Sequence, residues 1–384
     1  MSLGIYLTLL IGKNEPEPAP PLLINALQSV NVTTSDNSQN GFQITFSAGR
    51  NNAADIEDYP LLNSSLVKPF NRVRILVSFG TEPKVLIDGI ITHQQLNPSK
   101  EPGKSTLTLT GKDLSIMMDL EEEIKVFEDQ SDTAIVEKII KTYSKYGLVP
   151  KIITPDNMET PEKNNTIPSQ HTTDLKYIQS LAKKHKFVFY IENTDDSQKN
   201  IAYWGPTIER AGTPQKALTF NMGEYTNVNT INCTLDALQQ STLTGSIQDT
   251  DKGDTTNLPS GLPNSSPKLA LYSIADLFPD IKISRKSRES GISKAEATAM
   301  AQTEANNASS NAVTVTGEID TIHYKEVLKA RHLVALRGVG HTYNGLYYVK
   351  QVTHTITKGA YKQNFTLTRE GLGSTIDKVQ PHEQ

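Results

Sequence analysis

The sequence has little cysteine, no long apolar run and no excess of charge of either sign. Cys233 is the only cysteine, which excludes an internal disulfide framework and metal sites built from paired cysteines. The 38 Lys and Arg residues nearly balance the 42 Asp and Glu residues, and the net charge of −4 gives no global attraction to nucleic acid or anionic lipid. No run reaches the roughly 18 apolar residues of a membrane-spanning helix. We therefore expect a soluble protein, made in a cytoplasm or packed into a particle there, without direct nucleic-acid contact or membrane insertion.

The composition favours β structure. Apolar residues make up 36% of the chain, and the remainder is rich in Thr, Asn and Ser, of which Thr favours strands and the other two favour turns. The apolar stretch 3–11 has no basic residue before it and no small-residue cleavage site after it, so we expect a strand there rather than a signal peptide. At roughly 150 residues per domain, 384 residues predict two or three domains.

Residues 1–111 are predicted to contain only strands. Alternation such as Leu107 and Leu109 against Thr106, Thr108 and Thr110 is typical of a strand with one buried face. The predicted strands cover residues 5–11, 22–33, 42–47, 73–79, 85–95 and 105–111. This arrangement suits a small barrel or sandwich.

Residues 112–205 are predicted to form an inserted α/β unit. An apolar stripe from Ile135 to Tyr143 predicts a helix over residues 131–146, with Gly147 free to adopt positive φ at its end. A second stripe predicts a helix over 172–185, capped by Thr172 or Thr173, and strands follow at 186–192 and 200–204.

The third region resumes the strand pattern. We expect strand structure from 217 to 243, a flexible polar loop at 248–267, and an Ala-rich helix at 293–306 that starts with the capping-box pattern of Ser293 and Glu296. Strands at 313–315, 333–336, 345–357 and 361–368 then close an antiparallel set. Residues 371–384 are expected to be a tail.

No catalytic or cofactor constellation stands out, and we predict no enzymatic activity, cofactor or metal. Gly103-Lys104-Ser105 ends like a phosphate-binding loop, but Pro98 stands where the first Gly belongs. Cys233 lies in an alternating run and is expected to be a buried apolar thiol. The acids at 119–123 and 128–132 are expected to form a solvated patch. The histidines lack the spacing of a helical zinc site; they are His93, His171, His185, His323, His332, His341, His354 and His382.

Two groups are candidate protein interfaces. The dense basic run contains Lys282, Arg285, Lys286 and Arg288 and no aromatic residue, so it favours either an acidic partner subunit or a solvated loop over nucleic-acid stacking. Tyr343 and Tyr347, with Tyr348, could be interface anchors, although an aromatic ladder within a sheet is the favoured interpretation.

Several blocks of the chain resemble the phage late control protein D family, the baseplate hubs of contractile tails. The blocks keep the family's order over most of residues 70–370; they are Ser131-Asp-Thr-Ala-Ile-Val-Glu-Lys-Ile-Ile140, the segments 170–182 and 187–190, Tyr203-Trp-Gly-Pro206, 293–306, 345–354 and Phe365-Thr-Leu-Thr-Arg369.

The resemblance implies two barrel-like tube domains with an α/β insertion, as in the head of VgrG proteins. The first domain would comprise 1–111, completed by about 206–235, and the second would comprise 236–370. Such hubs act as homotrimers that join the hexameric inner tube to a trimeric spike. The implied partners are two further copies of the chain, a spike protein, an inner-tube or tube-initiator protein and other baseplate subunits, within a phage tail or a phage-tail-like injection particle.

Two further expectations accompany this interpretation. The chain ends at Gln384 without the oligonucleotide-binding fold and needle of VgrG, so the spike would be a separate polypeptide. The alternative function is a carbohydrate- or peptidoglycan-active enzyme or binding module of a tail or secreted complex, which would require a pocket with convergent acids.

Overall fold

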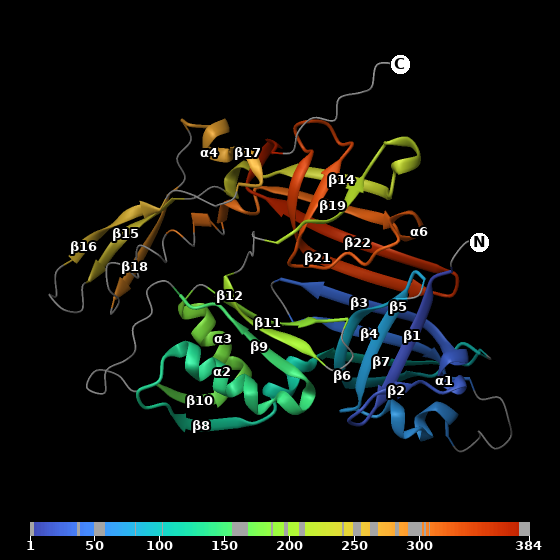
Figure 1. Ribbon diagram of the computed structural model, residues 1–384. Helices are drawn as coiled ribbons and strands as arrows, with labels where there is room; N and C mark the ends of the chain where they lie inside the picture. Colours follow the sequence, from blue (N-terminus) through green and yellow to red (C-terminus); the bar gives the residue numbers. More distant parts are fainter. Residues whose placement is uncertain are drawn as a thin grey trace.

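The computed structural model consists mostly of β-strands in large antiparallel sheets, as predicted (Figure 1). It describes residues 4–36, 39–49, 58–80, 82–101, 103–155, 168–185, 187–195, 199–206, 212–239, 242–248, 255–261, 268–280, 284–290, 302, 305–306 and 308–375.

One 13-stranded sheet dominates the molecule, in the order β14-β19-β22-β21-β3-β4-β7-β6-β5-β1-β2, with β20 paired to β21 and β13 paired to β20. Its strands are β1 Tyr6–Gly12, β2 Glu17–Pro18, β3 Leu27–Ser35, β4 Gly41–Ser47, β5 Arg72–Ser78, β6 Pro83–Asn97, β7 Thr106–Asp113, β13 Gln215–Thr219, β14 Val228–Leu235, β19 Val313–Asp320, β20 Leu333–Arg337, β21 Gly345–Thr357 and β22 Ala360–Arg369. The predicted strands of the first region are therefore present, but residues 21–26 form a short helix, α1 Pro21–Ala26, at the start of the expected strand 22–33. Pro21, at the first helical position, favours that start.

The sheet divides into two lobes with the same strand plan. In the first lobe β3-β4-β7-β6 form one layer, and β6 continues to β5 and β1. In the second lobe β14-β19-β22-β21 form the equivalent layer, and β21 continues to β20 and β13. In each lobe one long strand connects two parts of the sheet. β6 pairs with β5 near its start and with β7 near its end, and β21 pairs with β20 near its start and with β22 near its end. The outermost pair differs, because β13 runs parallel to β20 whereas β1 runs antiparallel to β5.

Each lobe has its own apolar core. Ile44, Phe46 and Ile75 are fully buried in the first, and Val315, Tyr347 and Leu367 are fully buried in the second. The lobes join where β21 pairs with β3 over seven residues, from Gln351 opposite Ser35 to Thr357 opposite Ser29. Two lobes of one chain thus share a single hydrogen-bonded sheet.

Two strands, β13 and β14, belong to a different lobe from the one that the sequence predicted. Residues 206–235 were expected to complete the first domain, but β13 pairs with β20 and β14 pairs with β19, both in the second lobe. The reason is topological: the chain that follows the insertion supplies the outer strands of the second lobe. The strands of the first lobe all lie within residues 6–113, and Val327, Ile356 and Tyr361 add to its apolar core.

The insertion follows the first lobe with the expected helices and strands. The helices α2 Asp132–Thr142 and α3 Asp174–Lys184 begin at Ser131 and Thr173, whose hydroxyls accept backbone N–H groups, and Gly147 has φ of 80°. They pack on a three-stranded sheet of β9 Leu148–Ile152, β11 Phe187–Asn193 and β12 Asn200–Pro206. A two-stranded sheet of β8 Glu122–Val126 and β10 Ser169–Thr173 completes the unit. A third apolar cluster, including Trp204 and Ile178, is its core.

A three-stranded sheet in the second half replaces part of the predicted loop. The strands are β15 Thr242–Gln248, β16 Thr255–Gly261 and β18 Ser284–Ser290, in the order β16-β15-β18, and they project from the main body (Figure 1). Residues 255–261 of the expected loop 248–267 are therefore a strand, because their backbone pairs with β15. The rest of that loop, apart from Gln248, lies outside the described residues.

Short elements complete the fold. Residues 371–374 of the expected tail form β23 Gly371–Ser374, which pairs with β17 Ala270–Ser273. Most of the predicted helix 293–306 lies outside the described residues, whereas Gln302, Ala305 and Asn306 are helical. Other helices in the described part of the chain are α4 Ile274–Leu277, α6 Thr321–Tyr324 and the 3₁₀ turns Pro60–Asn63, Ser65–Val67, Leu114–Met118, Ser144–Tyr146, Gly223–Tyr225 and Ala237–Gln239. Within the described part of the chain, no helix has the length and apolar character needed to cross a membrane.

Candidate assembly surfaces

Besides β13 and the outer strands β1 and β2, two strands of the main sheet have an edge that no described strand covers. β14 pairs only with β19. On β6, pairing with β5 ends at Ile90, so residues 91–97 pair with β7 alone. Neither segment contains a proline or a Lys, Arg, Asp or Glu residue, although natural proteins usually protect a free edge with such residues. The short outer strand β2, in contrast, consists of Glu17 and Pro18. The two unprotected edges are therefore candidate contact surfaces.

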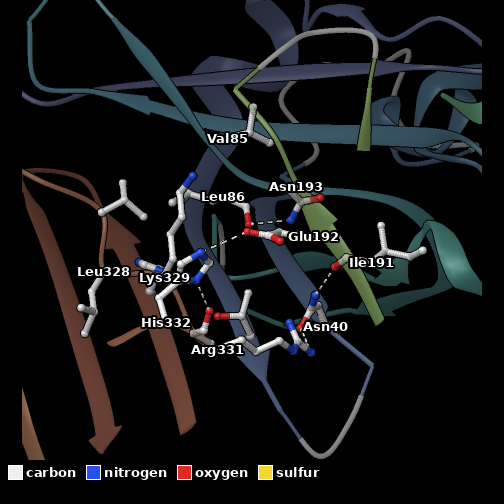
Figure 2. Close-up of a pocket in the computed structure, with 14 residues that line it drawn as sticks. Asn40, Val85, Leu86, Ile191, Glu192, Asn193, Leu328, Lys329, Arg331 and His332 are labelled. Atoms are coloured by element: carbon white, nitrogen blue, oxygen red, sulfur yellow. Dashed lines mark hydrogen bonds and ion pairs between the residues drawn. The ribbon is translucent and has the colours of Figure 1, made fainter. Parts of the chain in front are cut away.

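A hollow forms where both lobes meet the insertion (Figure 2). Its walls come from the β3–β4 connection at Asn40, from β11 and from the segment 327–332. Nε2 of His332 lies 3.3 Å from Oε1 of Glu192. The hydrogen bond to Glu192 raises the pKa of His332 above its usual value, against the effect of burial. Burial raises the pKa of Glu192, but the hydrogen bond to His332 and the positive charges of His332, Lys329 and Lys151 together outweigh it and hold that pKa below its usual value. The two groups therefore stabilise each other in their charged forms.

Arg331 ties the same junction from another side. Its guanidinium lies 4.0 Å from the ring centre of Tyr190 on β11, donates to the carbonyl of Ser35, and donates to Oδ1 of Asn40 over 3.2 Å. Asn40 in turn donates to the carbonyl of Ile191 over 3.2 Å. These contacts connect the end of β3 with the β3–β4 connection, β11 and the segment 327–332, and they hold the two lobes and the insertion together.

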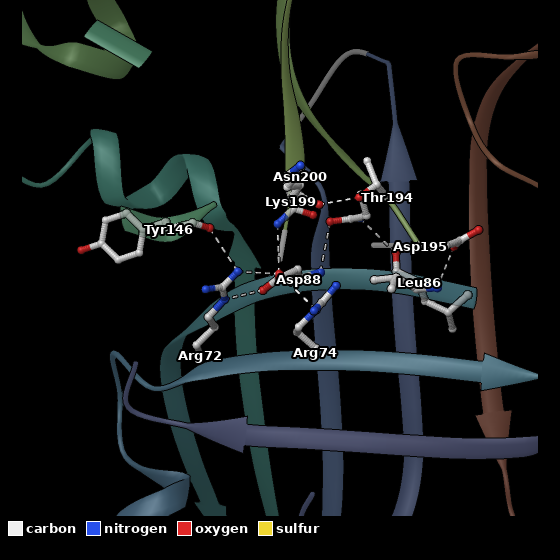
Figure 3. A network of polar contacts seen from close by, with 11 residues as sticks. Arg72, Arg74, Leu86, Asp88, Tyr146, Thr194, Asp195, Lys199 and Asn200 are labelled. Carbon is white, nitrogen blue, oxygen red and sulfur yellow. Dashed lines mark hydrogen bonds and ion pairs between the residues drawn. The ribbon is translucent and has the colours of Figure 1, made fainter. Parts of the chain in front are cut away.

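A buried ion-pair network fixes the insertion to the first lobe (Figure 3). Asp88 on β6 is fully buried and accepts hydrogen bonds from Arg72 at 2.8 and 2.7 Å. Nε of Arg74 lies 3.2 Å from the same carboxylate, and Asn200 of β12 donates to it over 3.0 Å. Arg72 also donates to the carbonyl of Tyr146 over 3.1 Å. These contacts hold β12 and the 3₁₀ turn Ser144–Tyr146 against β5 and β6.

One further hollow contains two carboxyl groups, Asp36 and Asp113, beside aromatic residues of β11. Burial raises the pKa of Asp113, while hydrogen bonds from Ser115 and Asn40 lower it. Its Oδ1 accepts from the backbone and hydroxyl of Ser115 at 3.0 and 2.5 Å, and its Oδ2 accepts from the backbone of Asn40 at 2.9 Å. Both oxygens of Asp113 therefore accept hydrogen bonds at the start of the 3₁₀ turn Leu114–Met118, which gives this residue a structural role.

The tyrosines predicted as interface anchors differ in exposure. Tyr347 is fully buried in the second core, where its hydroxyl donates to the carbonyl of Tyr343 over 2.7 Å and the guanidinium of Arg369 lies 4.3 Å from its ring. Its side chain packs inside the chain instead of facing a partner, because β21 turns it toward the core. Tyr343 is half-buried, and its role at an interface stays a prediction.

The basic run lies on a strand rather than on the loop that was expected. Arg285, Lys286 and Arg288 belong to β18, whose only described neighbour is β15. Lys282 lies outside the described residues. The basic run thus occupies an edge strand of the projecting sheet, and its contact with an acidic partner stays a prediction.

Among the described residues, no three His, Cys, Asp or Glu side chains gather as metal ligands would. Cys233 is half-buried on β14. His185 and Lys184 contact the carboxylate of Asp132 at 2.7 and 2.9 Å, which ties α3 to α2.

The sequence alone did not predict the buried network around Asp88 or the junction formed by Glu192, Arg331 and His332. A signal for Asp88 was present, because it is the one charged residue in the apolar run 85–91 and a buried charge requires a partner. Arg72 and Arg74, two positions apart on a strand, were available as partners. Glu192, Arg331 and His332 carried no comparable signal, since they meet only in the folded chain.

The chain matches the family model described as Alg8 N-terminal domain over residues 24–358. It belongs to this family. No curated protein matches the sequence of this Alg8 N-terminal domain family member. The matched model is not the late control protein D family, and that finer assignment stays a prediction.

Solved structures share the fold at low sequence identity. A tail protein from Neisseria meningitidis has a TM-score of 0.62 at 10% identity, covering 96% of this chain and 98% of that one. The 43 kDa tail protein of prophage MuSo2 from Shewanella oneidensis has a TM-score of 0.61 at 11% identity, covering 96% and 99%. The c3393 protein of E. coli, a type VI secretion component similar to the T4 bacteriophage tail proteins gp27 and gp5, has a TM-score of 0.52 at 10% identity, covering 89% and 73%. The Alg8 N-terminal domain family member therefore has the fold of phage-tail and type VI secretion proteins.

Proposed function

We propose that this chain is the structural hub of a contractile phage tail or contractile injection system, and that three copies form a ring joining a hexameric inner tube to a trimeric spike. Its partners would be two further copies, the spike, the inner-tube or tube-initiator protein and other baseplate subunits, as in the late control protein D and VgrG-type hubs that it resembles. In this role the chain is not an enzyme. The shared fold with tail proteins supports the proposal.

The repeated strand order carries the proposal. β14 has the place in the second lobe that β3 has in the first, and β6 has the place that β21 has in the second. Within one chain, β21 pairs with β3. If β6 of one copy lies beside β14 of the next, the contact between copies repeats the contact between lobes. Three copies then present six similar lobes, and such a head-to-tail contact gives a closed ring when the rotation that it repeats closes on the third copy.

The sequence shows the same repetition in the two hairpins. Thr106-Leu-Thr-Leu-Thr110 on β7 corresponds to Asn364-Phe-Thr-Leu-Thr368 on β22, and each follows a long bent strand. Both segments pair antiparallel with the strand before them, β6 and β21. The free edges described above would be covered by this ring, which removes their tendency to pair non-specifically.

The alternative, a carbohydrate- or peptidoglycan-active module, would centre on the hollow beside Asp36 and Asp113. The bonds that Asp113 accepts from Ser115 and Asn40 explain that residue without catalysis. We therefore favour the hub.

Cysteine cross-linking tests the proposed contact. In a full-length Cys233→Ser background, Gln95→Cys places a thiol on β6, and Thr234→Cys places one on β14. A short bis-maleimide should link the doubly substituted protein into covalent dimers and trimers and into nothing larger. Gln95→Cys alone should give far less product. Absence of cross-linking, or a ladder that continues beyond three copies, would contradict the trimeric hub.

A further inference from the structure

One face of the main sheet is polar across eight strands, from β14 to the end of β6. Its positions alternate with the core positions of each strand and carry almost only Thr, Ser, Asn and Gln. We call this surface the polar face; it consists of Thr230, Asn232 and Thr234 on β14, Thr314, Thr316, Glu318 and Asp320 on β19, Ala360, Lys362, Asn364, Thr366 and Thr368 on β22, Gln351, Thr353, Thr355 and Thr357 on β21, Ser29, Asn31, Thr33 and Ser35 on β3, Gly41, Gln43, Thr45 and Ser47 on β4, Thr106, Thr108, Thr110 and Lys112 on β7, and His93, Gln95 and Asn97 on β6.

The strand register shows that these residues form one continuous surface. Residues directly opposite each other on paired strands have side chains on the same side of the sheet. Thr353 on β21 is opposite Asn364 on one side and Thr33 on the other, so the polar face crosses the boundary between the lobes. The hydroxyls of Thr33 and Thr353 are 3.4 Å apart. Part of the surface is hollowed, over about 410 Å³, beside residues that include Thr316 and Gln351.

Charge is nearly absent from the polar face. Its lysine and carboxylate side chains are Lys112, Lys362, Glu318 and Asp320. Lys362 and Glu318 lie 3.1 Å apart as an ion pair, and the carboxylate of Asp320 lies 2.7 Å from Nδ1 of His323. Its one apolar side chain is the small methyl group of Ala360 at the end of β22, whereas the reverse side of the same strands carries the buried cores. The polar face therefore has neither a strong electrostatic field nor an apolar patch that would bind a passing molecule.

These properties favour one class of occupant. A surface that holds a nucleic acid needs many Lys and Arg side chains, because the phosphate backbone dominates affinity. A surface that passes a polyanion without holding it would benefit from acidic side chains, and the polar face has two, Glu318 and Asp320, of which Glu318 pairs with Lys362 and Asp320 contacts His323. A polypeptide carries both signs of charge and apolar groups, and it is retained least by a wall with neither.

We propose that the polar face is the wall of a passage through the ring and that the molecule passing along it is a polypeptide rather than a nucleic acid. This inference rests on the proposed hub function. It adds the class of cargo, which the fold itself does not specify. The sheet order is consistent with it, because the edges at β14 and at residues 91–97 of β6 are the two ends of the polar face, and joining copies there extends the wall without interruption.

Thiol reactivity tests the neutrality of the wall. Full-length protein with Cys233→Ser and Thr353→Cys is treated at low salt with two maleimide peptides of equal length, one with only lysine charges and one with only glutamate charges. The two rates should agree within about twofold and change little with added salt, because no field acts at the wall. Thr355→Cys is the second variant in case the first does not fold. Ile124→Cys on exposed β8, beside several glutamates, is the control and should favour the cationic peptide.

Photo-cross-linking in purified assembled particles tests the occupant. A benzophenone amino acid at Thr353 should give adducts that protease removes and nuclease does not, whereas the same group at Ile124 should give none to the same molecule. Three results would overturn the inference. In the thiol experiment these are a rate difference above about tenfold between the peptides, or thiols at positions 353 and 355 that neither peptide labels. In the photo-cross-linking experiment it is an adduct that nuclease removes. If the ring forms in the β6–β14 cross-linking experiment but any of these results appears, the hub survives and only the passage fails.

Discussion

Nδ1 of His354 lies 2.9 Å from the hydroxyl of Tyr361, and both side chains are buried between β21 and β22 beside the first lobe's core. Burial lowers the pKa of His354 to about 3. The imidazole is therefore neutral in the folded chain at any moderate pH. A neutral polar residue thus lies next to the boundary at which the two lobes share a sheet.

This histidine should make the protein sensitive to acid. The unfolded chain takes up a proton at His354 below a pH of about 6.5, while the folded chain does not. Stability should therefore fall as pH decreases from 6.5 toward 3, by up to about 1.4 kcal/mol per pH unit from this group. His354→Gln, which keeps a hydrogen-bonding side chain, should flatten the dependence. Urea unfolding at several pH values measures it, and parallel curves for the two proteins would count against the argument.

The pair of His332 and Glu192 predicts the opposite trend in a different range. The raised pKa of His332 gives stability that is present below its unfolded value of 6.5 and is lost as pH rises through the folded value. The lowered pKa of Glu192 gives stability that is present above its unfolded value of 4.5 and is lost as pH falls through the folded value. The pair should therefore contribute most between pH 4.5 and 6.5.

His332→Gln tests this window. The stability difference from the parent should be largest inside it and should disappear at alkaline pH. Because both side chains are partly exposed, the difference should be small, and high salt should reduce it further. A difference that persists unchanged at alkaline pH would show that packing rather than charge is responsible.

Asp88→Asn should be far more harmful. The variant keeps the shape of the side chain but leaves Arg72 and Arg74 without a carboxylate in a buried site, at a cost of about 3 kcal/mol. Asp195→Asn is the matched control, because Asp195 pairs with Lys84 at 3.2 Å in a half-exposed position and should cost less than about 1 kcal/mol. Denaturant midpoints of the full-length proteins compare them. Equal losses would mean that the buried network does not hold the insertion.

Local structure was predictable from the sequence where local signals agree. The helices over 131–146 and 172–185 combine an apolar stripe with a capping hydroxyl at each start, and both are confirmed. The alternating strands around Leu107 and Leu109 are confirmed for the same reason. The segment 255–261 was expected to be a loop because it belongs to a polar stretch rich in Asp, Gly, Ser, Thr and Pro, and its strand exists only through pairing with β15.

Long-range placement was not predictable in the same way. β13 and β14 precede the second lobe's other strands in the chain, and no local property shows which lobe they join; the parallel pairing of β13 with β20 decides it. Tyr343 and Tyr347 are similar in sequence context, yet one is half-buried and the other fully buried, because only Tyr347 lies within the regular part of β21. The polar face likewise emerges only when the register aligns eight alternating strands.

Electron cryomicroscopy of the assembled particle tests the central claim most directly. We predict a ring of three copies around the particle axis, with β14 of each copy beside residues 91–97 of β6 in the next, the insertion outside the ring, and the polar face lining its bore. A ring with two or six copies of the chain, or a polar face packed against another protein on the outside, would contradict the account.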